Sequence, residues 1–497
     1  MINHTRATVF LALLTFILSA SPALGKALED RNWIEVRTAN FQVRSLSGEK
    51  DTIKLARRLE MFRAAVAIVT NVNSTDVSIP TEIYALRRGR DFKHFGLDHD
   101  FGGEFMAGLR SNTVLLRDAN SMEEATTILH EYVHFLVSNH GRQHYPKWYN
   151  EGLAEYLSAI RNRRELFDIG LVAKHRRASL KDSRWIPIRK ILTAEEYYEK
   201  WADESKEMFY AEAWALVHYL KTRPDQKNSF SENMGRYLEF VESGKNDVDA
   251  FAEAFGITAR ELDSEVKRYV SNGEYKTFTF EADKLLPAFK VDVAKLTREQ
   301  VSLGLAKIAL KRGELDRAEH WFTIAEGQEL TRPRAEAGLG DVFKFRGDFE
   351  AAQPRFEQAA ALAPNDPYSQ LDFAEYWHYL AMNTKDAADR KEFLGSARNH
   401  YVKAWKLDDS TPETYAMYGQ TYLMEGNYSM AIEMLEEAES LLPSNLDIRL
   451  ILTEAYAGAG RNEQATEAAR SIVAWSHDEA VTKRVQEILA QLDAKKK

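Results

Sequence analysis

The sequence of 497 residues predicts an α+β domain over residues 26–275, followed by an all-α solenoid of helical repeats over residues 299–479. Two observations carry this prediction. Short stretches that alternate apolar and polar residues come first, and segments with helical spacing follow them. From residue 299 onward, the sequence repeats itself with a period of 34 residues. The composition, 44% hydrophobic and 28% charged, excludes a disordered chain and a multi-span membrane protein.

Residues 1–25 have the layout of a secretory signal peptide. Arg6 precedes an apolar run at 9–18, and small residues occupy positions 23 and 25, before Lys26. The run is about half as long as a membrane span requires. We therefore expect export to the periplasm or the extracellular space, with membrane association only if the segment is retained as an anchor.

Charge and cysteine content narrow the function classes. The chain carries 66 Lys and Arg against 75 Asp and Glu, a net charge of −9, so we expect no nucleic-acid partner. Cysteine is absent, which excludes disulfides, thiolate metal sites and cysteine nucleophiles. Any metal ion must be bound by His, Asp or Glu.

In the α+β domain, alternating segments predict strands before the helices begin. We expect short strands at residues 33–36, 41–44, 81–86 and 113–116, with a helix over 53–69. A further helix is predicted over 121–141, because Ser121 and Glu124 form a capping box and Gly141 ends the segment.

The predicted helix 121–141 carries the sequence His130-Glu131-Tyr132-Val133-His134. Two His residues four apart project from the same face of a helix, so both imidazoles can bind one Zn²⁺ at about 2.0–2.1 Å. Glu131 lies at the edge of that face, where it can accept a proton from a zinc-bound water. The alternative is a pair of surface histidines on an amphipathic helix.

A second helix, beginning near Trp148, supplies a candidate third ligand. A catalytic zinc site uses three protein ligands, and Glu151 follows His134 closely enough for an antiparallel helix to bring it there. Glu155, one turn later, is a candidate acceptor for the N–H of a ligand imidazole, and Asn150 is a second candidate supporting residue. The alternative is a solvated helix start, where acidic residues are favoured in any case.

Together, these residues resemble the gluzincin metallopeptidases, which include thermolysin-like and aminopeptidase N-like enzymes and the compact peptidase MA-like domains. The resemblance is carried by His130-Glu131-x-x-His134 and by Asn150-Glu151-Gly152-Leu153-Ala154-Glu155. It implies a zincin-like fold, one Zn²⁺ bound by His130, His134 and Glu151, Glu131 as general base, and Glu155 as a residue that orients a ligand. It extends over residues 30–270, although the gap between the two motifs is shorter than in those relatives.

The same resemblance suggests an oxyanion donor and a substrate-binding strand. Relatives use a Tyr on a later helix, and Tyr210 lies on a segment of helical spacing over 208–220. Tyr210 could instead pack in the core, and His218 is the rival donor. Relatives also place an edge strand beside the zinc, which here would be formed by Gly103, Phe105, Ala107 and Gly108.

From residue 299, frames of 34 residues place Gly and Ala at constant positions. The fifteenth residue is Gly313, Gly347, Gly426 or Gly460, and the twentieth is Ala318, Ala352, Ala431 or Ala465. This pattern resembles the tetratricopeptide repeat. We expect repeats at 299–332, 333–366, 367–411 with an insertion around 384–391, 412–445 and 446–479, then a capping helix and tail at 480–497. Residues 276–298 fit neither pattern and are interpreted as a linker.

The sequence therefore predicts an exported zinc metallopeptidase that hydrolyses peptide bonds in a peptide or protein substrate. Its repeats would recruit protein partners or substrates. The alternative is a catalytically silent, peptidase-like scaffold that mediates protein–protein interactions in the cell envelope.

Overall fold

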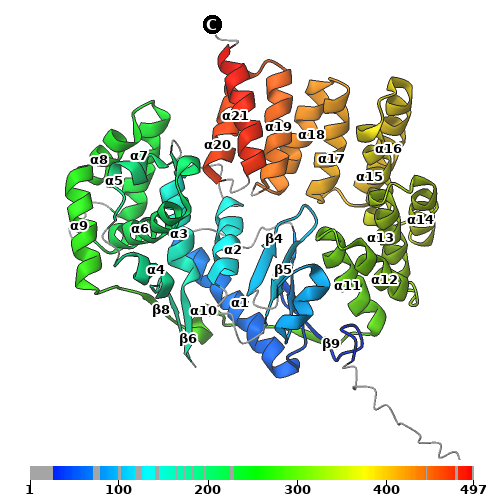
Figure 1. Cartoon of the computed structure of the whole chain (residues 1–497), viewed down its shortest axis with the longest axis horizontal. Coiled ribbons are helices and arrows are strands. Elements are labelled where there is room, and N and C mark those ends of the chain that lie inside the picture. Colours follow the sequence, from blue (N-terminus) through cyan, green and yellow to red (C-terminus); the bar gives the residue numbers. More distant parts are fainter. Residues whose placement is uncertain are drawn as a thin grey trace, which may run out of the picture.

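The computed structural model describes residues 26–70, 79–98, 102–117, 126–139, 145–163, 165–172, 174–181, 184–194, 197–223, 229–443, 445–475 and 479–494. The segment 1–25, with the predicted signal peptide, lies outside these residues, as do Ser121, Glu124 and Gly141. Within the described part, no helix combines the length and the apolar character needed to cross a membrane. An α+β domain comes first, and a helical solenoid curves over it (Figure 1).

The principal sheet has six strands in the order β4-β5-β3-β2-β1-β9. Strands β2, β3 and β5 pair in parallel, and the other pairs are antiparallel. The strands are β1 (Ile34–Arg37), β2 (Phe41–Ser45), β3 (Thr81–Ala85), β4 (Gly103–Met106), β5 (Asn112–Leu116) and β9 (Asp292–Lys295). The predicted strands and the order of strands before helices are confirmed, so the N-terminal unit is α+β.

Alternating side chains divide this sheet into two buried faces. Val43, Ile83 and Val114 point toward α1 (Glu49–Thr70) and α2 (Thr126–Ser138). Tyr84 and Leu115 point the other way, toward η1 (Gly89–Phe95), α11 (Arg298–Lys311) and α12 (Leu315–Ala325). The first repeat of the solenoid therefore covers one face of the sheet and completes the core of the domain.

A smaller antiparallel sheet, β6-β7-β8, lies beside the helical half of the domain. Its strands are β6 (Ile160–Arg163), β7 (Leu166–Ile169) and β8 (Phe278–Glu281). The helices of this half, η3 apart, are α3 (Lys147–Ser158), α4 (Lys174–Ser179), α5 (Ile188–Leu192), α6 (Asp203–Thr222), α7 (Phe230–Glu242), α8 (Asp247–Phe255) and α9 (Ala259–Asn272). The single turn η3 (Tyr198–Lys200) precedes α6.

The prediction of a linker at 276–298 is wrong. Strand β8 pairs with β7, α10 (Ala282–Leu285) follows it, and β9 then pairs with β1 along Ile34–Arg37. The segment escapes sequence patterning because its strands have only four residues each, and β9 is exposed along its whole length. It is an integral part of both sheets.

The solenoid consists of paired antiparallel helices, two for each predicted repeat. After α11 and α12 these are α13 (Arg332–Phe345), α14 (Phe349–Leu362), α15 (Pro367–Asn383), α16 (Ala387–Leu407), α17 (Pro412–Met424), α18 (Tyr428–Leu441), α19 (Leu446–Gly458) and α20 (Asn462–Trp475), with α21 (Glu479–Ala494) as the cap. Gly313, Gly347, Gly426 and Gly460 turn the chain between the helices of a pair with φ of 74–79°. The insertion forms no separate loop, because it lengthens α15 and α16 to 17 and 21 residues.

Candidate functional site

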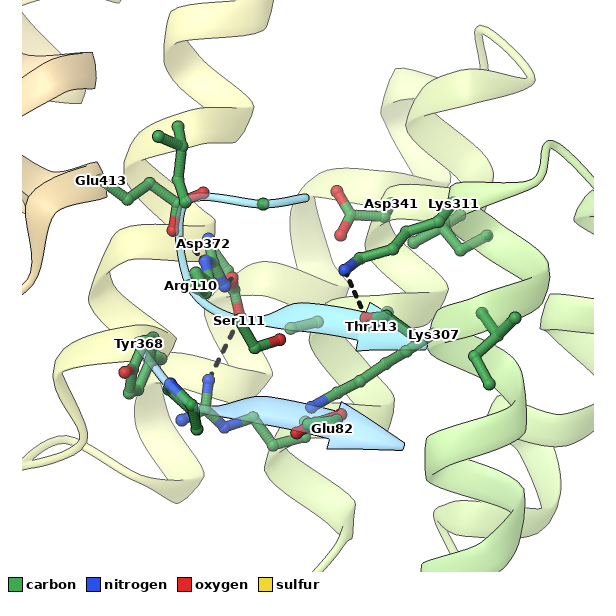
Figure 2. Close-up of a pocket in the computed structure, with 18 of the residues that line it drawn as sticks. Glu82, Arg110, Ser111, Thr113, Lys307, Lys311, Asp341, Tyr368, Asp372 and Glu413 are labelled. Atoms are coloured by element: carbon green, nitrogen blue, oxygen red, sulfur yellow. Dashed lines mark hydrogen bonds and ion pairs between the residues drawn. The ribbon is translucent and has the colours of Figure 1, made fainter. Parts of the chain in front are cut away.

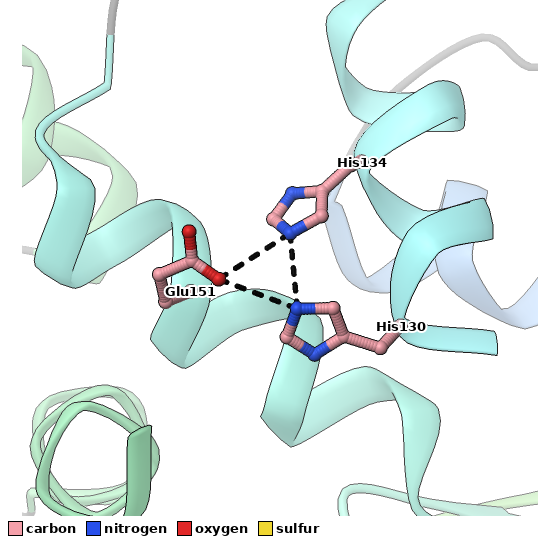
Figure 3. Close-up of side chains that lie close together, drawn as sticks. All are labelled: His130, His134 and Glu151. Carbon is pink, nitrogen blue, oxygen red and sulfur yellow. Dashed lines mark hydrogen bonds and ion pairs between the residues drawn. The ribbon is translucent and has the colours of Figure 1, made fainter. Parts of the chain in front are cut away.

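His130 and His134 project from α2, and Glu151 projects from the facing helix α3 (Figure 3). The Nε2 atoms of the two histidines lie 3.1 Å apart. Glu151 Oε2 lies 3.3 Å from His130 Nε2 and 3.5 Å from His134 Nε2. The structure thus brings together the three residues predicted as metal ligands, with one donor atom from each side chain facing the others.

The spacing of these donor atoms fits a tetrahedral metal ion. Bonds of about 2.0–2.1 Å from zinc to N and O place tetrahedral ligand atoms about 3.3–3.4 Å apart. The three measured separations, 3.1, 3.3 and 3.5 Å, bracket that value. Two imidazoles and one carboxylate are also the donor set of many catalytic zinc sites.

Helix α3 is held in place by packing along its whole length. Every one of its residues is buried, and Gly152 lies against the backbone of α6: a Cβ atom added there would be 2.4 Å from the carbonyl oxygen of Ala213. Glycine therefore permits α3 and α6 to cross closely. That crossing fixes Glu151, the preceding residue, opposite the two histidines.

Glu155 connects the other side of the His130 ring to an arginine. Its Oε1 lies 3.4 Å from His130 Nδ1, and Arg176 donates two hydrogen bonds to the same carboxylate, at 2.9 and 2.6 Å. This contact would fix the orientation of the imidazole, the role expected for Glu155. Arg176, on α4, has no sequence signal, because no motif or period marks its segment. Asn150 is buried on α3 beside Glu151.

The carboxylates favour positive charge at this point. Burial lowers the pKa of His130, but Glu151 and Glu155 outweigh burial and raise it to about 10. Burial raises the pKa of Glu155, yet hydrogen bonds from His130 and Arg176 lower it to about 2. A divalent cation would supply the positive charge that this cluster stabilises.

A cavity of about 150 Å³ adjoins His130 and is lined by Glu131, Glu155, Arg176 and Tyr210. Tyr210, on α6, has its ring 6.0 Å from that of His130, and its hydroxyl lies 3.0 Å from the hydroxyl of Tyr198. Burial, the charge of Glu151 and the contact with Tyr198 raise the pKa of Tyr210, so its hydroxyl keeps its proton. Sequence reasoning missed Tyr198.

The two candidate oxyanion donors lie in different surroundings. His218 packs against Tyr156 and Trp214, and its Nδ1 lies 2.6 Å from the hydroxyl of Tyr269. It is fully buried in the core on α6, whereas Tyr210 lines the cavity beside His130. The geometry therefore favours Tyr210 over His218 as the group that can face a substrate.

The predicted edge strand exists but is shorter than expected. Gly103 and Phe105 belong to β4, at the edge of the sheet, where Gly103 lies against Ile128 of α2 and Phe105 contacts Phe135. Ala107 and Gly108 are not in the strand, which ends at Met106. They begin the turn to β5, and Gly108 lines a second, larger cavity. The prediction that these two residues form the edge strand is wrong.

Two family models match parts of the chain. Residues 422–492 match a family described as tetratricopeptide repeat. The C-terminal part of this chain is a tetratricopeptide-repeat solenoid. Such repeats generally mediate protein–protein interactions, and the repeat prediction is confirmed. Residues 124–241, which contain His130, His134, Glu151 and Tyr210, match a family described as protein of unknown function (DUF1570).

Individual relatives cover mainly the repeats. TPR repeat-containing protein YpiA of Bacillus subtilis (strain 168) is 24% identical over 186 residues, 32% of this chain and 44% of that protein, so the match spans less than half of that relative. TTC0263, a thermophilic TPR protein of Thermus thermophilus, has 21% identity and a TM-score of 0.35 over 39% of this chain and 99% of its own. PilF of Pseudomonas aeruginosa has 13% identity and a TM-score of 0.32, over 40% and 89%.

Proposed function

We propose that the N-terminal domain is a zinc-dependent peptidase and that the repeats bring it a protein partner or substrate. The observation that carries the proposal is the triangle of His130 Nε2, His134 Nε2 and Glu151 Oε2, whose sides match a tetrahedral zinc site. A zinc ion bound there would polarise a substrate carbonyl and lower the pKa of a bound water. An exported location remains part of the proposal.

The side chains around the triangle divide the work of hydrolysis. Glu131 lines the cavity beside His130, where it would accept a proton from the attacking water and pass it to the leaving amine. Tyr210, protonated and lining the same cavity, would donate a hydrogen bond to the oxygen of the attacked carbonyl. Glu155 would hold the ring of His130 in one orientation.

The comparisons support the interaction half of this proposal better than the peptidase half. The matched repeats and the names of the relatives describe tetratricopeptide proteins, and the family that covers the zinc motif has no stated function. A second candidate is therefore a catalytically silent scaffold that uses both domains to bind proteins.

Metal content and proteolysis separate the two candidates. Residues 26–497 would be purified as the wild type and as Glu131→Gln, and each would be assayed for zinc and for hydrolysis of casein. The peptidase proposal expects about one zinc in both proteins and hydrolysis in the wild type alone. Zinc in both with hydrolysis in neither would favour the scaffold, and absence of zinc from both would refute the metal site.

A further inference from the structure

A second cavity, of about 560 Å³, lies between the N-terminal domain and the inner side of the solenoid (Figure 2). Its solenoid wall comes from α11, α13, α15 and α17, the first helices of four successive repeats. Its other wall comes from β3, β5 and the turn between β4 and β5. This volume is typical of pockets that bind a ligand.

Arg110, in the turn between β4 and β5, reaches into this groove. Its guanidinium forms ion pairs with Asp372 and Glu413, and it donates a 2.9 Å hydrogen bond to Glu375 Oε2. Its guanidinium carbon also lies 5.7 Å from the centre of the Tyr368 ring. Three carboxylates and an aromatic ring, on α15 and α17, thus surround one arginine of the neighbouring domain.

The negative charge around Arg110 exceeds what it neutralises. Three carboxylates face one guanidinium, and a neighbouring cation, Arg334, is 4.0 Å from Asp372 but donates its 2.9 Å hydrogen bond to Asp366. Burial and an adjacent carboxylate raise the pKa of Glu375 to about 8. The cluster therefore has capacity for a cation beyond Arg110.

Arg110 lies in a turn and is not needed for the main contact between the domains. That contact is apolar: Tyr84, Leu86 and Leu115 of the sheet pack against Val301 and Leu305 of α11. The sheet and the first repeat can remain packed when the turn moves. The open volume beside Arg110 gives a competing chain room to enter.

We propose that the groove formed by Tyr368, Asp372, Glu375 and Glu413 binds an arginine-bearing segment of a partner protein. Arg110 occupies it as an internal ligand, which the partner displaces. The inference concerns binding alone, so it does not depend on peptidase activity in the N-terminal domain.

The first test uses the turn itself as the probe. A fluorescent peptide with the sequence of residues 105–113 would be titrated against residues 26–497 by anisotropy, beside the same peptide with its arginine replaced by glutamine. Arg110→Gln should bind the arginine peptide at least ten-fold more tightly than the wild type, because the internal competitor is gone. Adding Asp372→Asn should reverse that gain. Arg57→Gln, which removes the ion pair between Arg57 and Asp283 elsewhere in the domain, should match the wild type.

Two outcomes would overturn the proposal: Arg110→Gln binding no more tightly than the wild type, or equal binding of the glutamine peptide. If Arg110→Gln does not fold, Ser111→Cys decides the matter. The chain contains no cysteine, so this thiol in the turn is unique. Millimolar arginine peptide should accelerate its reaction with a maleimide at least three-fold, and the glutamine peptide should not. An unchanged labelling rate would refute displacement.

Discussion

Replacing Glu155 with glutamine should weaken zinc binding without touching a metal ligand. The carboxylate lies 3.4 Å from His130 Nδ1 and accepts two hydrogen bonds from Arg176. Glutamine keeps the volume but removes the charge and leaves one oxygen to serve both partners. Hydrogen bonds to charged groups contribute about 1.5–3 kcal/mol. Because the amide oxygen retains part of this, we expect a loss of about 1.5–2 kcal/mol, or roughly ten- to thirty-fold in the zinc dissociation constant.

Competition with a chromophoric chelator at pH 7.5 measures this constant directly. Glu131→Gln is the matched control, since Glu131 adjoins the first histidine and is expected to bind no metal, so its dissociation constant should stay within about three-fold of the wild type. Glu151→Gln should lose more than Glu155→Gln, because it replaces a ligand. A folded Glu155→Gln protein that binds zinc as tightly as the wild type would refute the assigned role of Glu155.

Three further predictions concern α3 and α6. Tyr210→Phe should lower kcat for casein by about 10²–10³-fold with unchanged zinc affinity; unchanged kcat would remove Tyr210 from the mechanism. Gly152→Ala should force α3 from α6, costing about 1–3 kcal/mol and weakening zinc binding through Glu151; a Tm and a zinc affinity equal to those of the wild type would contradict this reading. Burial raises the pKa of Glu212 from 4.5 to about 8, although the Ile186 N–H donates to it. Its protonated form therefore stabilises the fold fully below about pH 4.5, and this contribution is lost as the pH rises through 8. Glu212→Gln should then gain in Tm relative to the wild type between pH 6 and pH 9, and a constant difference would refute the assignment.

The parts of the site that the sequence predicts are those set by local geometry. His130 and His134 share a helical face because they are four residues apart, and Glu151 joins them because a short connection returns the chain along α2. The glycines that end the first helix of a repeat are likewise local, since each needs a positive φ.

The features missed by the sequence depend on pairing between distant segments. Strand β9 returns to β1 across more than 250 residues, and α11 belongs both to the first repeat and to the core of the sheet. Arg110 and Arg176 find their carboxylates only after these elements are assembled. A single arginine in a turn carries no period or motif, so local sequence patterns cannot predict its partner.

The short junction between the domains sets a threshold for any competing ligand. Only residues 296 and 297 separate β9, hydrogen-bonded to β1, from the start of α11, so the solenoid has no slack relative to the sheet. Even a short flexible tether gives an effective concentration on the order of millimolar, and a geometrically matched one gives more. A single arginine in a partner would be outcompeted at cellular concentrations. The groove should therefore respond only to a segment that offers several contacts at once, or to a partner held nearby.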